Sequence, residues 1–251
     1  MKGGAINRIN WRIVLGIILI LLSGALYIIH YVIFKDSHHI FIYLLGDIAF
    51  VPIEVLLVTL VIDQLLKGRE QRSLLNKLNM VIGVFFTEVG TPLLRHFSAF
   101  DTDLGRLKEK LKLDYNWSTK HFTEVKRYLK HMEHEVDSTH GSLGLLKGFL
   151  LEKRTFLLML LENPNLLEHE SFTELLWAVT HVSEELMNRE DVYNLPVADY
   201  KHLSGDIKRA YVLLITEWLS YLHHLRQRYP YLYSLAVRTN PFNPDIPVTF
   251  I

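Results

Sequence analysis

The sequence predicts an all-α protein, in which a two-span transmembrane helical hairpin is followed by a cytoplasmic helical-bundle domain. Two apolar runs near the N-terminus, residues 13–34 and 40–62, carry this prediction, because the first has no charged residue and the second has only two. Each run has about twenty residues, enough to cross roughly 30 Å of hydrocarbon as a helix. From residue 63 onward, helix-forming residues dominate and the glycines and prolines are sparse and clustered, which favours further helices.

The first apolar run is expected to be a membrane helix that is retained. It is longer than the apolar core of a signal peptide, lacks a small-x-small cleavage site and is followed by a second span. Basic residues precede the first run and follow the second, whereas Lys35 in the short turn 35–39 is balanced by Asp36. Because basic residues mark the cytoplasmic side, we expect a multi-pass protein of the cell (inner) membrane with both termini, including residues 1–12, in the cytoplasm.

The rest of the chain divides by composition. Residues 63–117 are expected to form a helical extension and connector, residues 118–238 the cytoplasmic helical domain, and residues 239–251 a Pro-rich extended tail. Within the connector, the apolar segment 79–90 is too short to span a bilayer. It lies at the membrane surface, is buried in the domain or packs between subunits. The following Thr91-Pro92 bends or restarts the helix.

The helical domain is expected to contain several longer helices and one short helix at its end. The longer helices cover residues 118–136, 143–161, 171–189 and 199–228, and the short helix covers residues 231–237. Ser171 followed by Glu174 is typical of a capping box. In the tail, Pro241, Pro244 and Pro247 recur at every third position, which favours polyproline II. The tail is expected either to pack as a strap on its own or a neighbouring subunit, or to dock on a partner.

Two carboxylates, Asp47 and Glu54, interrupt the second apolar run. Because they are seven residues apart, they lie on nearly the same face of a helix. A carboxylate in the bilayer interior costs several kcal/mol on insertion scales, so neither is expected to face lipid. Pro52 between them removes one backbone hydrogen bond and is expected to bend the helix.

The first span offers partners for these acids. Ser23, Tyr27 and His30 share one helix face, and Tyr27 lies at about the depth of Asp47. Two interpretations stay open. In the structural one, Asp47 bonds to Tyr27 within the hairpin and Glu54 is satisfied across a subunit contact. In the functional one, carboxylates from several subunits line a wet path for cations or protons. Two further explanations of these acids are that the membrane span covers other residues than those assumed, or that a lipid headgroup binds them.

The thirteen histidines raise the question of a metal site. His131, His134 and His181 lie well away from the apolar stripes of their predicted helices, so their side chains are expected to point to solvent or to another chain. Metal sites in carboxylate-bridged bundles project inward and use Glu-x-x-His pairs, and the sequence has none. We therefore expect no metal and no cofactor. A pH-sensitive histidine face stays open as an alternative.

The last long helix carries a candidate polar rim. Asp206, Glu217 and His224 share one line beside its wide apolar face. In one interpretation, two carboxylates and a histidine form a functional site. In the other, they make ion pairs with neighbouring helices. The candidate partners for such pairs are Arg127, Lys147 and Arg154.

Composition argues against several classes of function. Lys plus Arg and Asp plus Glu number 27 each, and this neutral balance argues against a nucleic-acid partner. Cysteine is absent, so there is no disulfide, thiolate metal ligand or cysteine nucleophile. Phosphate-binding loops, dinucleotide fingerprints, GxSxG and HExxH are also absent. We expect no enzyme, and a metal-dependent helical enzyme is the least favoured hypothesis.

These observations predict an oligomeric integral membrane protein, a cation or proton channel or transport protein with Glu54 and Asp47 lining the path. The cytoplasmic helices would assemble and gate it, and the lipid bilayer and further copies of the chain are the expected partners. The alternative is a membrane-anchored signalling or scaffolding module that binds a cytoplasmic protein partner. Of the two acids, Glu54 is the better functional candidate, because its own hairpin offers it no obvious partner.

Overall fold

The computed structural model describes residues 11–243, with the backbone alone for residues 11, 12, 70–77 and 167. The chain divides into two compact units, Met1–Glu70 and Gln71–Ile251, and the long helix α2 (Ser37–Phe85) contributes to both. Within the described residues the secondary structure is helical apart from one isolated bridge between Asp101 and Val136, which confirms the all-α prediction.

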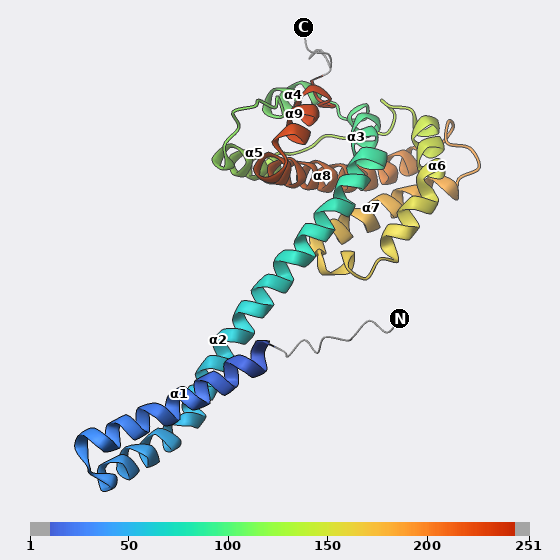
Figure 1. Ribbon diagram of the computed structural model, residues 1–251. Coiled ribbons are helices and arrows are strands. Elements are labelled where there is room, and N and C mark those ends of the chain that lie inside the picture. The colour runs from blue at the N-terminus through green and yellow to red at the C-terminus, as the bar shows by residue number, and fades with distance from the viewer. Residues whose placement is uncertain (1–10, 244–251) are drawn as a thin grey trace, which may run out of the picture. The chain divides into compact units, whose positions relative to one another are not determined.

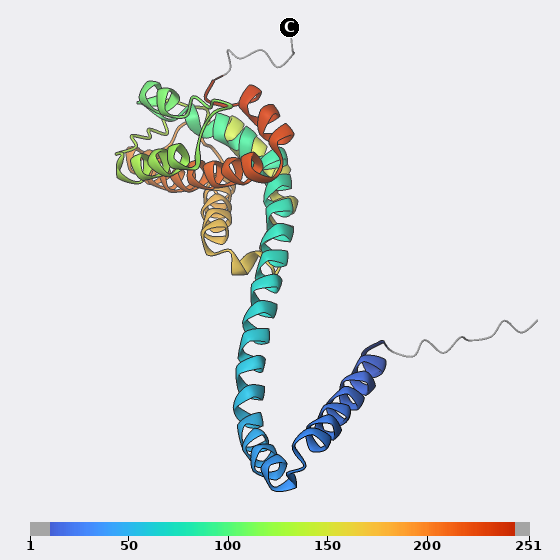
Figure 2. The same cartoon turned by 60° about the vertical axis from the view of Figure 1, so that its left-hand side comes forward.

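The first unit is a pair of apolar helices joined by a tight turn. Helix α1 covers Trp11–Phe34 and is terminated by Lys35, whose φ of 49° lies in the left-handed region. The N–H of Lys35 donates to the Tyr31 carbonyl at 2.8 Å. Asp36 then caps α2, because its Oδ1 accepts the N–H of His39 at 3.1 Å. This cap starts the second helix at Ser37 rather than at residue 40. Helices α1 and α2 diverge from the turn (Figures 1 and 2).

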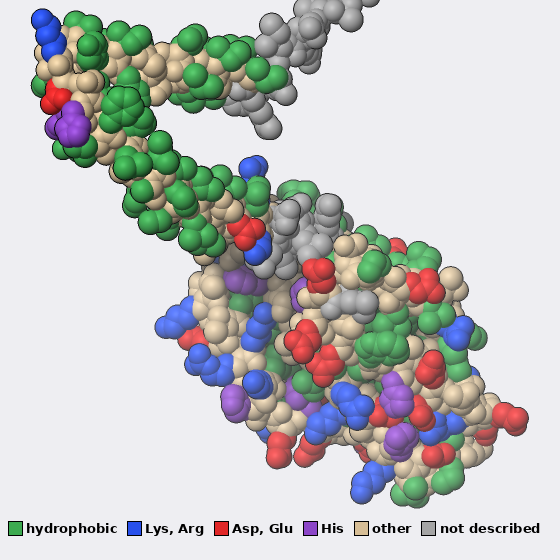
Figure 3. Space-filling model, turned by 90° about the horizontal axis from the view of Figure 1, so that it is seen from below, with side chains coloured by type: hydrophobic (Ala, Val, Ile, Leu, Met, Phe, Trp, Pro, Cys, Tyr) green, Lys and Arg blue, Asp and Glu red, His purple; other side chains and the backbone are tan. Residues whose placement is uncertain are grey.

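Helix α2 continues without a break through Pro52 and past Asp63, as expected for an outward continuation of the second apolar run. Aliphatic and aromatic side chains cover the surface of the first unit (Figure 3). Two helical segments, Ile13–Phe34 and Ser37–Arg69, are long and apolar enough to cross a membrane by length and composition.

The second unit begins with the apolar segment 79–90. Ile82, Phe85, Phe86 and Val89 are at most 3% exposed, whereas Met80 and Val84 are 61% and 52% exposed, so one face of this segment packs into the helical unit and the other stays exposed. A π-helical turn, η1 (Phe86–Gly90), then leads into α3 (Thr91–Ser98). Gly90 and Thr91 both keep right-handed helical backbone angles, so the chain runs from α2 through η1 into α3 without leaving the helical conformation, and no restart after a break occurs at Thr91.

The long helix α8 (Val197–Arg228) organises the second unit. It packs against α3, α5 (Thr119–His131), α7 (Glu170–Met187) and α9 (Pro230–Arg238), while α6 (Leu143–Leu161) packs on α7 (Figure 1). The remaining short elements are α4 (Leu104–Lys110) and the 3-10 turn η2 (Leu166–Glu168). Apolar side chains from these helices form one continuous core.

Several predicted boundaries are wrong for local reasons. Helix α5 stops at His131 rather than at residue 136, because the next residues extend and bring Val136 opposite Asp101 in the bridge. The N-terminus of α7 is capped by His169 Nδ1, which accepts the N–H of Phe172 at 3.3 Å. The expected capping box of Ser171 and Glu174 is therefore wrong.

The start of the expected tail packs on its own chain. The Asn240 side-chain amide donates to the Leu111 carbonyl at 2.8 Å, and the ring of Phe242 lies 5.5 Å from that of Trp218. Phe242 is 2% exposed, which supports a strap as far as residue 243. Pro244 and Pro247, on which the polyproline II prediction rests, lie outside the described residues.

Candidate functional site

The two candidate carboxylates of the second apolar run, Asp47 and Glu54, lie exposed on α2. Neither makes a hydrogen bond or an ion pair with any residue of the part of the chain that the structure describes. The expected bond between Tyr27 and Asp47 is therefore absent from the hairpin. The carboxylate oxygens of both acids therefore remain available to accept hydrogen bonds from groups outside the described residues.

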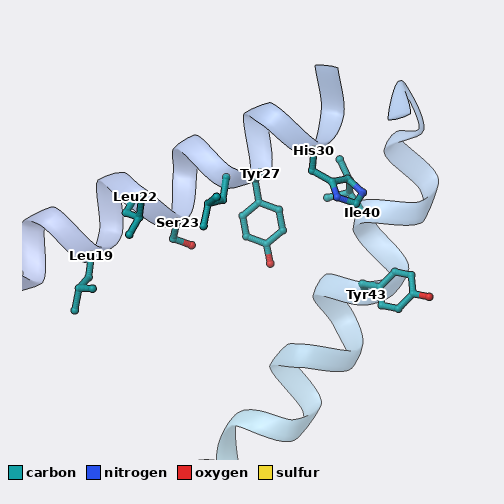
Figure 4. Close-up of a pocket in the computed structure, with 8 residues that line it drawn as sticks. Leu19, Leu22, Ser23, Tyr27, His30, Ile40 and Tyr43 are labelled. Carbon is teal, nitrogen blue, oxygen red and sulfur yellow. The ribbon is translucent and has the colours of Figure 1, made fainter. Parts of the chain in front are cut away.

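The structure instead brings Ser23, Tyr27 and His30 together around a different place. They line a pocket of about 460 Å³ between α1 and α2, and Figure 4 shows them along the side of α1 that faces α2. From α2, Ile40 and Tyr43 complete the lining, and neither Asp47 nor Glu54 reaches it. The pocket is otherwise aliphatic.

An aromatic stack closes the turn end of this pocket. The rings of His30 and His39 are stacked with centroids 6.1 Å apart, and His39 lies 4.5 Å from Tyr43. His30 Nε2 is buried and has no hydrogen-bond partner among the described residues. Sequence reasoning paired His30 with the acids by helix face, but His30 lies near the turn, where its ring stacks on that of His39.

The candidate rim of Asp206, Glu217 and His224 does not form one site. Glu217 is 5% exposed. Burial lowers the pKa of Lys126, and the negative charge of Glu217 acts in the opposite direction and raises it. Lys126 in turn donates to Ser220 Oγ at 2.8 Å. His224 lies beside Tyr229, with ring centroids 5.8 Å apart. The three residues point to three different neighbourhoods around α8.

The expected ion-pair partners of that rim are also wrong. Lys147 donates to the backbone carbonyl of Arg189 at 2.6 Å, and within the described residues no ion pair joins the rim to Arg127 or Arg154. Asp206 instead meets two histidines. Its Oδ2 lies 3.4 Å from His181 Nε2 and 3.2 Å from His202 Nε2.

Sequence reasoning missed this cluster because it judged each histidine against its own helix. His181 does lie off the apolar stripe of α7, but the neighbouring α8 covers that side with His202 and Asp206. A usable signal is present in the sequence. His181 and Glu185 on one helix, and His202 and Asp206 on the next, are both His-x-x-x-acid pairs that share a helix face.

A second cluster of polar side chains is buried where α5, α8 and the Asp101–Val136 bridge meet. Asp101, His134 and Tyr211 are 8%, 3% and 0% exposed, so the expectation of a solvent-facing His134 is wrong. Burial raises the pKa of Asp101 and of Tyr211 and lowers the pKa of His134. His134 also lines a surface pocket of about 660 Å³ beside α8.

We expect the helical unit to lose stability on acidification from about pH 7 to about pH 5. Burial lowers the pKa of His96, His134, His223 and His224 below the ordinary value of about 6.5. Below that value the unfolded chain binds more protons than the folded chain, so the free energy of unfolding falls as the pH falls. Denaturant midpoints of the full chain in detergent, measured at several pH values across this range, give the slope of unfolding free energy against pH that checks this expectation.

His134 is the most buried of these histidines, so His134→Gln should flatten the slope more than His224→Gln does. A slope unchanged by His134→Gln would contradict the assignment. Asp101 acts with the opposite sign at lower pH. Because its pKa is raised above about 3.9, its protonated form favours folding, and this contribution is lost as the pH rises through the raised pKa.

An apolar two-helix unit followed by an all-α unit built around one long helix defines the class of this protein. Family models match both units: "MJ1433, N-terminal helical domain" matches residues 6–66, and "Uncharacterized protein MJ1433, C-terminal helical domain" matches residues 74–238. The chain belongs to the MJ1433 family. It is 47% identical over 237 residues to "Uncharacterized protein MJ1433" of Methanocaldococcus jannaschii, across 94% of this chain and 95% of that protein. No solved structure matches it.

Proposed function

We propose that this protein is an oligomeric integral membrane protein that conducts or transports cations or protons past Glu54 and Asp47. Helix α1 and the apolar part of α2 span the bilayer as a hairpin, with the helical unit in the cytoplasm. The two apolar helical segments of 22 and 33 residues support this proposal, since none of the residues in their apolar windows is buried inside the protein. A water-exposed surface of that kind would be unfavourable, whereas lipid covers it without cost.

One observation carries the proposal: the two carboxylates in the apolar part of α2 are exposed and make no bond within the described residues. A charged or unbonded carboxyl group facing hydrocarbon is costly, so in a bilayer these groups need partners or water. One hairpin cannot enclose water. Several copies with their acids facing one another would supply a hydrated path and explain why the described residues of one chain offer these acids no partner.

Pro52 contributes to the same stretch of α2. Because proline has no N–H, the carbonyl of Ile48 receives no helical hydrogen bond from it. Ile48 follows Asp47 in the sequence, so a free backbone oxygen and a carboxylate lie within one helical turn. Both are hard oxygen ligands of the kind that alkali and alkaline-earth cations prefer.

We expect purified full-length protein in liposomes to pass cations or protons, and the double variant Asp47→Asn with Glu54→Gln to lose at least about tenfold of that flux. The reason is that the neutral amides no longer attract a cation or accept a proton. Ion-sensitive and pH-sensitive dyes inside the vesicles measure the flux. Asp63→Asn is the matched control, because Asp63 lies on the same helix but forms an ion pair with Lys67 at 2.7 Å.

The proposal would be contradicted if the unmodified protein passed neither monovalent cations, divalent cations nor protons. Equal flux from the double variant would also contradict it. If Glu54→Gln alone removes most of the flux and Asp47→Asn does not, Glu54 is the principal residue of the path.

The second candidate function is a membrane-anchored module that binds a cytoplasmic protein. It is favoured by large apolar side chains that stay exposed on α6 and α7: Leu151, Met159 and Trp177 are 58%, 60% and 59% exposed. If liposomes show no flux and a defined partner binds the full chain but not the Trp177→Ser variant, this function replaces the first.

A further inference from the structure

We propose that His181, His202 and Asp206 form a binding site for one divalent transition-metal ion, with Zn²⁺ as the ion that fits best. The site lies between α7 and α8, in the helical unit, and is independent of the carboxylates of the hairpin. Each residue offers one ligand atom, and these atoms lie within 4.8 Å of one another.

Two of the three separations between ligand atoms, those to the carboxylate oxygen, match metal coordination, and all three lie within 4.8 Å. Asp206 Oδ2 lies 3.2 Å from His202 Nε2 and 3.4 Å from His181 Nε2. In a tetrahedral zinc site with bonds of about 2.1 Å, neighbouring ligand atoms are roughly 3.4 Å apart. The distance from the carboxylate oxygen to each histidine nitrogen is therefore already close to the distance between neighbouring ligand atoms in a zinc site. A small rotation of their exposed rings would centre the ion.

The buried carboxylate provides the second and independent observation. The side chain of Asp206 is only 6% exposed, and its Oδ2, the atom that both histidines approach, is buried without a hydrogen-bond partner among the described residues. A buried carboxylate oxygen that two imidazole nitrogens approach, without a hydrogen bond from either, is unfavourable. The nearest guanidinium, that of Arg209, lies 3.9 Å from the other oxygen, Oδ1, and so leaves Oδ2 available.

The ligand types select the metal. Two imidazoles with one carboxylate suit Zn²⁺ and other first-row transition-metal ions, whereas Ca²⁺ and Mg²⁺ prefer sites made of oxygen alone. The side chains of His181 and His202 are 43% and 53% exposed, so an ion can enter from solvent. With three protein ligands, a water molecule is expected to occupy the fourth position.

Glu185 stands beside this site without completing it. Its Oε2 lies 3.6 Å from His202 Nε2, but the same oxygen accepts a charge-assisted bond from Arg189 at 2.7 Å. Arg189 also reaches Asp199 at 3.3 Å, which ties the guanidinium to both acids. Glu185 therefore stays with Arg189 and adds negative charge near the ion.

This proposal departs from the expectation of no metal site. That expectation required Glu-x-x-His pairs pointing into a bundle core, and this site uses His-x-x-x-acid pairs at the edge between two helices. Because the ion would bond to both α7 and α8, it would hold together helices that pack side by side. Binding to the folded state should therefore raise the midpoint of thermal unfolding.

The test uses the full chain in detergent, stripped with a chelator and titrated with Zn²⁺ and with Co²⁺. We expect one ion per chain, the visible absorption of four-coordinate Co²⁺, and a rise in the unfolding midpoint. His202→Gln should weaken Zn²⁺ binding by at least about 100-fold, since loss of one of three ligands exceeds the roughly 10–100-fold effect of losing an outer-shell group. Mg²⁺ at the same concentration should not compete.

Control variants separate this site from general histidine binding. His140→Gln removes an exposed histidine that stands 3.2 Å from a single carboxylate, Asp137, and it should leave Zn²⁺ binding unchanged. Asp206→Asn should weaken binding like His202→Gln, and circular dichroism checks that each variant is folded. Less than stoichiometric Zn²⁺, or equal affinity in the folded His202→Gln protein, overturns the proposal.

Discussion

Phe172→Ala is expected to lower the free energy of unfolding of the helical unit by about 3–5 kcal/mol. Phe172 is fully buried on α7, and its ring meets that of Phe85 edge to face, with centroids 5.1 Å apart and planes at 88°. The substitution removes the apolar surface of the ring and leaves a cavity that the surrounding helices fill only in part. It also removes the aromatic pair that joins α7 to the end of α2.

Trp177→Ala on the same helix is the matched control. Trp177 loses more atoms but is 59% exposed, so its removal should change stability by no more than about 0.5 kcal/mol. Denaturant midpoints followed by far-UV circular dichroism measure both variants. Equal destabilisation by the two substitutions would show that burial of Phe172 does not hold α7 in place.

Gly90→Ala is expected to destabilise the same unit by about 1–3 kcal/mol through overpacking. Gly90 is the last residue of the π-helical turn η1, and a Cβ there would clash with the ring of Phe86 and lie 3.0 Å from that of Phe85. Both rings are buried, so neither can swing out into solvent. The turn therefore requires the absence of a side chain at this position.

Gly148→Ala provides a control of opposite sign. Gly148 lies inside α6, is exposed, and has nothing within 4 Å of an added Cβ. Alanine there should stabilise the helix by roughly 0.5–1 kcal/mol, because it restricts the unfolded chain and has the higher helix propensity. The same denaturant measurement compares the two variants, and a destabilising Gly148→Ala would remove the basis of this comparison.

The local features of the chain were largely predictable. The two apolar runs and the helical character of the rest follow from hydropathy and helix periodicity. These signals act within a few residues of one another. Even here the ends depend on individual contacts, since Asp36 starts α2 early and His169 caps α7 in place of Ser171.

The candidate sites were predictable only where they stay within one helix. The placement of Asp47 and Glu54 on one exposed stretch of α2 needed no tertiary information. The proposed bond between Tyr27 and Asp47 depended on how two helices face each other, and the divergence of α1 and α2 leaves it unmade. The rim of Asp206 with Glu217 and His224 failed for the same reason.

The sequence by itself determined which stretches are helical, which are apolar enough to enter a bilayer, and where charged residues interrupt them. Tertiary structure alone decided that one face of the segment 79–90 is buried, that His134 is inside the protein, and that His181 meets His202 and Asp206. The reason is physical. A helix's periodicity reveals the side it must cover, but the residue that covers it comes from a distant part of the chain, and only packing brings the two together.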